Sequence, residues 1–205
     1  MPIREGREYR SFSAANFRAL DEQGSYVVEG YATTFDEPYD FGFDGAKECI
    51  ARNALDGADM SDVIFQYDHE GRVLARQRNN TLSVMCDDHG LYVRADLGGS
   101  EQGRQLYEEI QNGLVDRMSW AFIIDDGGWE YDRETRTSTI TKVSKVFDVS
   151  AVSIPANGDT EIHARSYFDG VIEMEQQELL QREKENEREA RRRYAAALAM
   201  SVVKG

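Results

Sequence analysis

The chain has 205 residues, of which 40% are hydrophobic, so it can bury a full core and carry an appendage. Its formal net charge of −14 disfavours a nucleic-acid-binding protein, because phosphate contacts are made mostly by lysine and arginine. No apolar run approaches the roughly 20 residues that a membrane-spanning helix needs, so we expect no membrane partner.

Cys49 and Cys86 are the only cysteines, and they do not form a C-x-x-C pair. This spacing disfavours a disulfide framework and a zinc site, so we expect two reduced thiols, no metal and no cofactor. The first residues also lack the apolar core of a secretory signal, so the expected compartment is the cytoplasm.

Most of the predicted elements are short strands. The polar residues 1–20 predict a strand start or a loose arm, and the Pro, Gly and Asp residues of 36–45 predict a loop. Stretches rich in β-branched and aromatic residues, or alternating between apolar and polar ones, predict strands. In chain order these stretches are residues 25–35, 48–50, 63–69, 82–86, 90–97, 116–124, 129–131, 137–143 and 145–152.

Two helices are expected among these strands. Residues 52–58 predict a brief helix that presents Ala54 and Leu55 to the core. Residues 100–110 predict a clearer helix, because Ser100 suits an N-cap and the apolar residues after it share one face. Many short strands with frequent turns and few helices predict a mainly β, α+β fold, either a barrel or a sandwich with peripheral helices.

The composition changes sharply after Ser166, which predicts a domain over residues 1–166 and a tail over 167–205. Residues 173–200 contain no Gly or Pro and are dominated by Glu, Gln, Arg and Ala, which is typical of a solvated, charged helix. Its apolar positions are too sparse for a coiled-coil seam. The tail therefore predicts a C-terminal helix that docks on a partner or is cut away, with an ordinary surface helix as the alternative.

Three apolar, strand-like stretches each contain one residue that is capable of catalysis, and these residues are His69, Ser119 and Asp148. Burying polar groups costs free energy unless they find partners, so three such residues in one domain indicate that they contact one another. A histidine, a serine and a carboxylate are the parts of an activated serine nucleophile. The pattern therefore predicts an enzyme, and a hydrolase in particular.

Each of these residues also has a structural interpretation. His69 ends a strand before a turn at Glu70-Gly71, which suits a general base at a rim but also a hydrogen-bonded structural histidine. Ser119 can be a buried serine satisfied by the backbone, and Asp148 can be paired with an imidazole, a backbone group or an arginine. Residues 115–117 are candidates for oxyanion stabilisation, through backbone N–H groups or the guanidinium of Arg117.

The chain lacks a G-x-S-x-G elbow, and the order histidine, serine, acid differs from that of chymotrypsin-like, subtilisin-like and α/β-hydrolase enzymes. Five segments in this order and spacing instead resemble the prohead (capsid maturation) proteases of tailed bacteriophages, which are similar in fold to the herpesvirus assemblin proteases. The segments are residues 29–35, 48–55, 68–70, 113–122 and 148–157.

The resemblance implies an assemblin-like β-barrel in which His69 is the general base, Ser119 the nucleophile and Asp148 the third member. This family usually has a glutamate at the position of Asp148, so the shorter side chain would have to approach His69 by about one methylene more. Assemblins use a second histidine as the third member. His89 and His163 are the candidates for that role, and neither lies in a matching motif.

The resemblance also implies a function. The chain would be a serine endopeptidase that cleaves the scaffolding segment of the major capsid protein, and itself, during prohead maturation. It would act as a homodimer inside the precursor capsid, in the host cytoplasm, and the tail would be a cleavable or scaffold-binding appendage. The alternatives are a non-catalytic capsid-assembly protein that binds the scaffold and a β-sandwich ligand-binding module, which the Tyr and Trp content suggests.

Overall fold

The computed structural model describes residues 6–12, 17–20, 24–40, 46–153, 180–186, 188–189 and 191–192. The chain divides into two compact units, of which one is Ile3–Glu161 and the other combines Met1–Pro2 with Ile162–Gly205. The domain boundary predicted at Ser166 lies outside the described residues and stays a prediction.

The larger unit is built mainly from β-strands. In chain order they are β1 (Glu8–Phe12), β2 (Arg18–Ala19), β3 (Val27–Thr34), β4 (Tyr39–Asp40), β5 (Lys47–Ile50), β6 (Ile64–Tyr67), β7 (Glu70–Arg76), β8 (Leu82–Cys86), β9 (Gly90–Asp96), β10 (Arg117–Ile124), β11 (Trp129–Asp132), β12 (Thr137–Ile140) and β13 (Val143–Val152). A short 3₁₀ helix, η1 (Gln77–Asn79), and the α-helix α1 (Glu101–Gln111) interrupt them.

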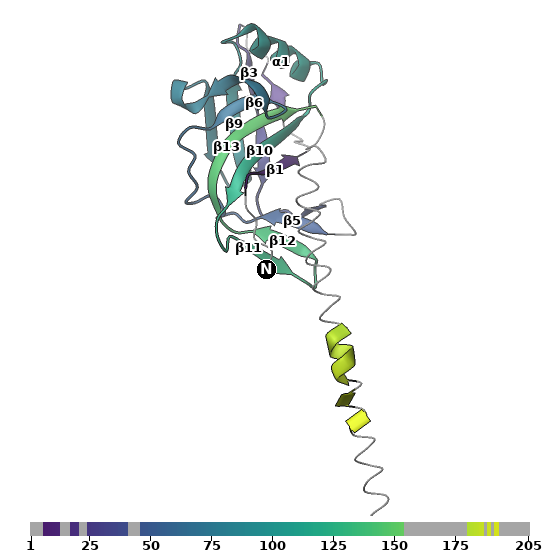
Figure 1. Cartoon of the computed structure of the whole chain (residues 1–205). Helices are drawn as coiled ribbons and strands as arrows, with labels where there is room; N and C mark the ends of the chain where they lie inside the picture. Colours follow the sequence, from purple (N-terminus) through teal and green to yellow (C-terminus); the bar gives the residue numbers. More distant parts are fainter. Residues whose placement is uncertain are drawn as a thin grey trace, which may run out of the picture. The chain divides into compact units, whose positions relative to one another are not determined.

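The strands form three hydrogen-bonded sheets. A five-stranded sheet has the order β1-β10-β13-β6-β7, and two four-stranded sheets have the orders β11-β12-β5-β4 and β2-β3-β9-β8. Figure 1 shows β1, β10 and β13 side by side, with α1 at one end of these strands. The predicted mainly β, α+β class is confirmed. No closed barrel is found among the described strands, and the likeness to assemblins stays a prediction.

Strand β10 packs against the core on one face and carries polar chemistry on the other. Met118, Trp120 and Phe122 alternate with Ser119 and Ala121, and all five are fully buried. The rings of Trp120 and Phe122 stack with their centroids 3.8 Å apart. Burying each large apolar side chain contributes roughly 1.5–3 kcal/mol, so the core face fixes the register of β10 firmly.

The helix α1 forms as predicted. The Ser100 side chain accepts a hydrogen bond of 3.0 Å from the backbone N–H of Gly103, which caps the first turn. Leu106, Tyr107 and Ile110 are buried on one face. Gly113 follows the helix with a φ of 71°, a left-handed conformation that glycine adopts without steric cost.

The brief helix predicted over residues 52–58 is wrong, because this segment is a series of turns. The N–H groups of Ala54, Asp56 and Ala58 each donate to the carbonyl three residues earlier. The segment contains Asn53, Asp56 and Gly57, residues that favour turns over helix interiors. Ala54 and Leu55 are nevertheless buried, as predicted.

Other element boundaries also differ from the prediction. The predicted loop over residues 36–45 contains β4, and the predicted arm contains β1 and β2. The chain passes from one sheet to another between Ile140 and Val143. The N–H groups of Thr141 and Lys142 both donate to the carbonyl of Gly128 there, which ends β12 earlier than the sequence pattern predicts.

In the second unit, residues 180–186, 188–189 and 191–192 are helical and exposed, and Figure 1 draws them in yellow-green. The rest of the predicted charged helix lies outside the described residues. Within the part of the chain that the structure describes, no helix is both long enough and apolar enough to cross a membrane.

Candidate active site

The register of two neighbouring strands places Ser119 and Asp148 on one face of the five-stranded sheet. In the antiparallel pair β10–β13, Ser119 lies opposite Ser150 and Ala121 lies opposite Asp148. Paired residues share a face, as do residues two apart on one strand. The side chains of Ser119, Ser150 and Asp148 therefore project from the same face, opposite to the one that bears Trp120.

His69 lies in the tight turn between β6 and β7. Asp68 and His69 have φ angles of 49° and 58°, and Tyr67 pairs with Glu70, so this is a two-residue hairpin with both central residues in the left-handed region. Asp and His tolerate that region better than most residues. The predicted turn at Glu70-Gly71 is wrong, because Glu70 already begins β7 and His69 itself is part of the turn.

The turn that carries His69 is fastened to the end of β13. The N–H of Asp68 donates to the carbonyl of Ala151 at 2.9 Å. The carboxylate of Asp68 accepts two hydrogen bonds of 3.0 Å from Ser153, one from the N–H and one from the hydroxyl. Strand β6 also runs parallel to β13 beside it. These bonds fix the position of His69 relative to the strand that carries Asp148.

The three residues singled out in the sequence form one chain of hydrogen bonds. The imidazole of His69 bonds through Nδ1 to Oδ1 of Asp148, and its Nε2 lies 2.6 Å from Oγ of Ser119. A carboxylate can only accept, so Nδ1 carries the proton and Nε2 is free to accept the serine hydroxyl. The side chain of Asp148 is 2% exposed and that of His69 is 13% exposed.

Ser150 belongs to this network, although the sequence analysis did not single it out. It is buried, and its hydroxyl donates a 3.0 Å hydrogen bond to Oδ1 of Asp148, the oxygen that His69 also contacts. The signal in the sequence is its spacing. A serine two residues after Asp148 on a strand shares its face, and a hydroxyl is a suitable donor to a buried carboxylate.

The other sequence candidates do not join the network in the described residues. The ring of His89 packs edge-on against Tyr31, with centroids 4.5 Å apart. His163 lies outside the described residues. The guanidinium of Arg117 is partly exposed and lies 3.7 Å from the Asp116 carboxylate. The oxyanion role considered for residues 115–117 stays a prediction.

Strand β1 approaches the site from the edge of the sheet. The ring of Tyr9 packs edge-on against the His69 ring, with centroids 4.8 Å apart. The carbonyl of Arg10 lies 3.0 Å from Oγ of Ser119 and can accept a hydrogen bond from it. The hydroxyl of Ser119 therefore has two possible acceptors and one proton.

The side chain of Arg10 points to the other face and is buried in an ion pair with Glu48. Its Nε and Nη2 atoms lie 2.5 Å and 3.1 Å from the two carboxylate oxygens. Burial alone would lower the pKa of Arg10, but the charge and hydrogen bonds of Glu48 outweigh it and raise that pKa above its usual value. This pair links β1 to β5 of a second sheet.

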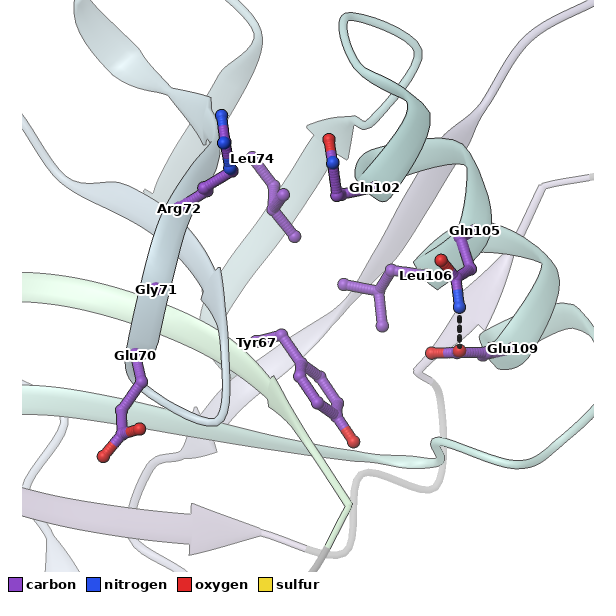
Figure 2. Close-up of a pocket in the computed structure, with 9 residues that line it drawn as sticks. All are labelled: Tyr67, Glu70, Gly71, Arg72, Leu74, Gln102, Gln105, Leu106 and Glu109. Carbon is purple, nitrogen blue, oxygen red and sulfur yellow. Dashed lines mark hydrogen bonds between the residues drawn. The ribbon is translucent and has the colours of Figure 1, made fainter.

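A cavity of about 290 Å³ lies beside the His69 turn, between β6–β7 and α1. Figure 2 shows Tyr67, Leu74 and Leu106 pointing toward one another there, and Gln105 donates to Glu109 at 3.2 Å on the helix. Gln66 pairs with Ser150, so Gln66 shares the face of Ser119, and Tyr67 points to the opposite face. The cavity is therefore separate from the Ser119 hydroxyl.

Neither thiol lies in a disulfide, with Cys49 buried and Cys86 exposed. Within the described residues, no cluster of three or more His, Cys, Asp or Glu side chains is arranged to hold a metal ion.

A family model described as caudovirus prohead serine protease matches residues 13–173, which is most of the chain. The chain belongs to this family. The resemblance to prohead proteases is therefore confirmed, and with it the class of serine peptidase. Searches of curated proteins and of solved structures return no match.

The match to the prohead serine proteases contains His69, Ser119 and Asp148, and it begins after the end of β1 at Phe12. The hydrogen-bonded network thus lies inside the part of the chain that resembles the family. Strand β1 lies outside it.

Proposed function

We propose that this prohead-family protein is a serine endopeptidase in which Ser119 is the nucleophile, His69 the general base and Asp148 the acid that orients His69. The observation that carries the proposal is the continuous path from Oγ of Ser119 through both ring nitrogens of His69 to Asp148. Such a path is a known arrangement that activates a serine hydroxyl as a nucleophile near neutral pH.

The geometry supports acyl transfer in two halves. As Oγ of Ser119 attacks the carbonyl carbon of a peptide, its proton passes to Nε2 of His69. His69 then gives this proton to the amine as the C–N bond breaks, which leaves an ester on Ser119. A water molecule attacks that ester while His69 takes one of its protons, and the proton returns to Oγ as the acid product leaves. Proton transfer of this kind contributes roughly 10²–10⁴-fold to the rate.

Asp148 stays ionised throughout this cycle. It holds the proton of His69 on Nδ1 and stabilises the imidazolium that forms twice per turnover. Its burial strengthens this interaction, because water does not screen the charge. Ser150 donates a second hydrogen bond to the same carboxylate oxygen that His69 contacts, which lowers the cost of burying the charge.

Family membership supports the finer assignment of the substrate. We infer that the enzyme cleaves the scaffolding segment of the major capsid protein, and itself, inside the precursor capsid in the host cytoplasm, as a homodimer. The helical residues 180–186 are exposed, so a protease can reach this part of the tail. The substrate and the self-cleavage are tested together by co-expression with the capsid precursor, comparing the fragment masses for the wild type and Ser119→Ala.

A fluorophosphonate probe tests the chemistry directly, because it reacts covalently with activated serines only. We expect the wild type to be labelled and Ser119→Ala and His69→Ala to stay unlabelled. Ser83→Ala, which removes a serine from β8 in a different sheet, is the matched control and should be labelled like the wild type. Equal labelling of Ser119→Ala would rule out Ser119 as the nucleophile, and a failure of every form with an intact Ser119 and His69 to react would favour the non-catalytic capsid-assembly protein.

A further inference from the structure

The proposed nucleophile has no exposed surface, since Ser119 is 0% accessible. A protease must nevertheless bring a stretch of polypeptide to this hydroxyl. Strand β10 lies between β13 and β1 in the sheet, and Ser11 of β1 lies directly opposite Ser119. Strand β1 also contacts the other reacting group, because the ring of Tyr9 packs on His69.

We propose that β1 occupies the position in which β10 receives an extended substrate peptide. The binding surface is then the edge of β10 that β1 covers, and its partner is a strand-like segment of the polypeptide to be cut. This inference rests on the proposed role of Ser119, and it adds the place and the backbone geometry of substrate binding.

The position of the Arg10 carbonyl supports this placement. It lies 3.0 Å from Oγ of Ser119, so a carbonyl group on the antiparallel neighbour of β10 is already within reach of the nucleophile. Attack requires Oγ roughly 3–3.5 Å from the carbonyl carbon, so a substrate carbonyl must turn from this hydrogen-bonded orientation before it reacts. A peptide that pairs with β10 as β1 does would bring its own backbone within reach of the Ser119 hydroxyl.

Among the strands that the structure describes, the sheet offers no alternative edge beside Ser119. Strand β10 has two neighbours, β13 on one side and β1 on the other. Strand β13 carries Asp148 and must stay in place for the hydrogen-bonded network to exist. Addition of a strand at a sheet edge is a common way to bind an extended peptide, because the backbone groups of the edge supply the affinity. Only the side of β1 can serve in this way.

Strand β1 also differs from the rest of the sheet in its relation to the family. The family match begins at residue 13, so it covers the segments that carry the three proposed catalytic residues but not β1. A strand that is tethered to the enzyme competes with substrate at a high effective concentration. The buried pair of Arg10 and Glu48 adds to its hold on the site. The full chain is therefore closed at rest and reacts when β1 withdraws.

A reversible lock tests the inference in the full chain. Tyr9 and Ala121 lie opposite each other in β1 and β10, so cysteines at both positions can form a cross-strand disulfide. The double variant Tyr9→Cys/Ala121→Cys is made with Cys86→Ser, which removes the exposed thiol. The rate of fluorophosphonate labelling is measured before and after reduction. We expect the oxidised form to react at least about ten times more slowly than the reduced form.

The matched control is Ser83→Cys/Arg94→Cys with the same Cys86→Ser change. It places a disulfide of the same kind between β8 and β9, in a sheet that does not carry Ser119. Its labelling rate should not depend on oxidation.

A second variant changes the rate in the opposite direction. Tyr9→Ala removes the ring that packs on His69 and should speed labelling by about 2- to 10-fold, the range that an aromatic contact is worth. Tyr9→Phe keeps the ring that packs on His69 and should not show this acceleration. A strand that only supports the sheet would give slower or unchanged labelling in Tyr9→Ala.

The outcomes separate the two proposals. Equal rates for the oxidised and reduced lock, or no acceleration by Tyr9→Ala, would overturn the role of β1 and leave Ser119 as the nucleophile. If neither the wild type, nor Tyr9→Ala, nor the reduced lock reacts, the proposed function fails and the inference fails with it.

Discussion

Replacement of Asp148 by asparagine is the sharpest test of how His69 is activated. The carboxylate accepts from Nδ1 of His69 and from the hydroxyl of Ser150 while it is 2% exposed. An asparagine side chain of the same shape offers one oxygen and one NH₂ group in their place. When the NH₂ faces His69, Nδ1 must accept, so the ring proton moves to Nε2 and the base can no longer take the proton of Ser119.

The expected loss follows from this change of tautomer. In other Ser–His–Asp enzymes the same substitution lowers turnover by about 10⁴-fold. At about 1.36 kcal/mol for each factor of ten, the loss corresponds to about 5.4 kcal/mol of transition-state stabilisation. The assay is the rate of fluorophosphonate labelling, with denaturant unfolding of the same sample to show that the variant is folded.

The matched control is Asp148→Glu, which keeps the charge. The added methylene must fit a buried site, at a cost of roughly 1–3 kcal/mol in stability. We therefore expect a less stable variant that still labels within about a hundredfold of the wild type. If Asp148→Asn labels within tenfold of the wild type, Asp148 does not set the tautomer of His69 and the reasoning is refuted.

Three further changes test other parts of the structure. Ser150→Ala removes the hydroxyl bonded to Asp148 and should cost roughly 1.5–3 kcal/mol of unfolding free energy together with about tenfold in labelling rate. Ser150→Thr keeps the hydroxyl and should retain the labelling rate, although its added methyl must fit a buried site at a cost of roughly 1–3 kcal/mol in stability. A rate equal to wild type in Ser150→Ala would show that the hydrogen bond is irrelevant to the site. Gly90→Ala would place a Cβ 2.0 Å from the carbonyl oxygen of Thr33 and should lower the free energy of unfolding by more than about 3 kcal/mol, measured by urea unfolding. Gly57→Ala is the control, because a Cβ there meets nothing within 4 Å, and it should change that free energy by less than about 1 kcal/mol. Burial and the hydrogen bond to Glu29 raise the pKa of Tyr92 to about 12. The contribution of this hydroxyl to stability is therefore complete below the unfolded pKa near 10 and is lost as pH rises toward 12. Tyr92→Phe should show a shallower loss of stability between these two pH values, and identical slopes for wild type and variant would contradict the shift.

The parts of the fold that could be predicted are those whose signal is local. Alternation along residues 82–97 predicts the β8–β9 hairpin, and the run of apolar residues around Ser119 predicts β10, because in both cases the pattern reflects which face is buried. The N-cap and apolar face of α1 are equally local. The prediction of a brief helix over residues 52–58 is wrong, because a series of turns, and not a helix, carries its buried apolar residues into the core.

The missing parts depend on contacts between distant segments. The sequence of β1 predicts a polar arm, because its residues are polar and their partners are distant in the chain. Tyr9 faces His69 and Arg10 pairs with Glu48, and a local pattern shows neither contact. Ser150 gains its meaning only once Asp148 is known to be buried against His69. The convergence of His69, Ser119 and Asp148 was expected from the cost of burying polar groups, but their spacing along the chain contains no information on which sheet unites them.

The His69 turn explains how an aspartate, rather than the longer glutamate, can pair with the histidine. An aspartate is shorter by one methylene, so either β13 or the histidine must come closer. The left-handed backbone of Asp68 and His69 makes the tightest hairpin available between β6 and β7. The bonds from Asp68 to Ala151 and Ser153 hold that hairpin against β13, where the Nδ1 of His69 meets the shorter carboxylate directly. Two non-glycine residues with positive φ carry a conformational cost, and they persist because these bonds over-determine the turn. The turn and its bonds to β13 thus hold His69 within hydrogen-bonding reach of the short Asp148 side chain.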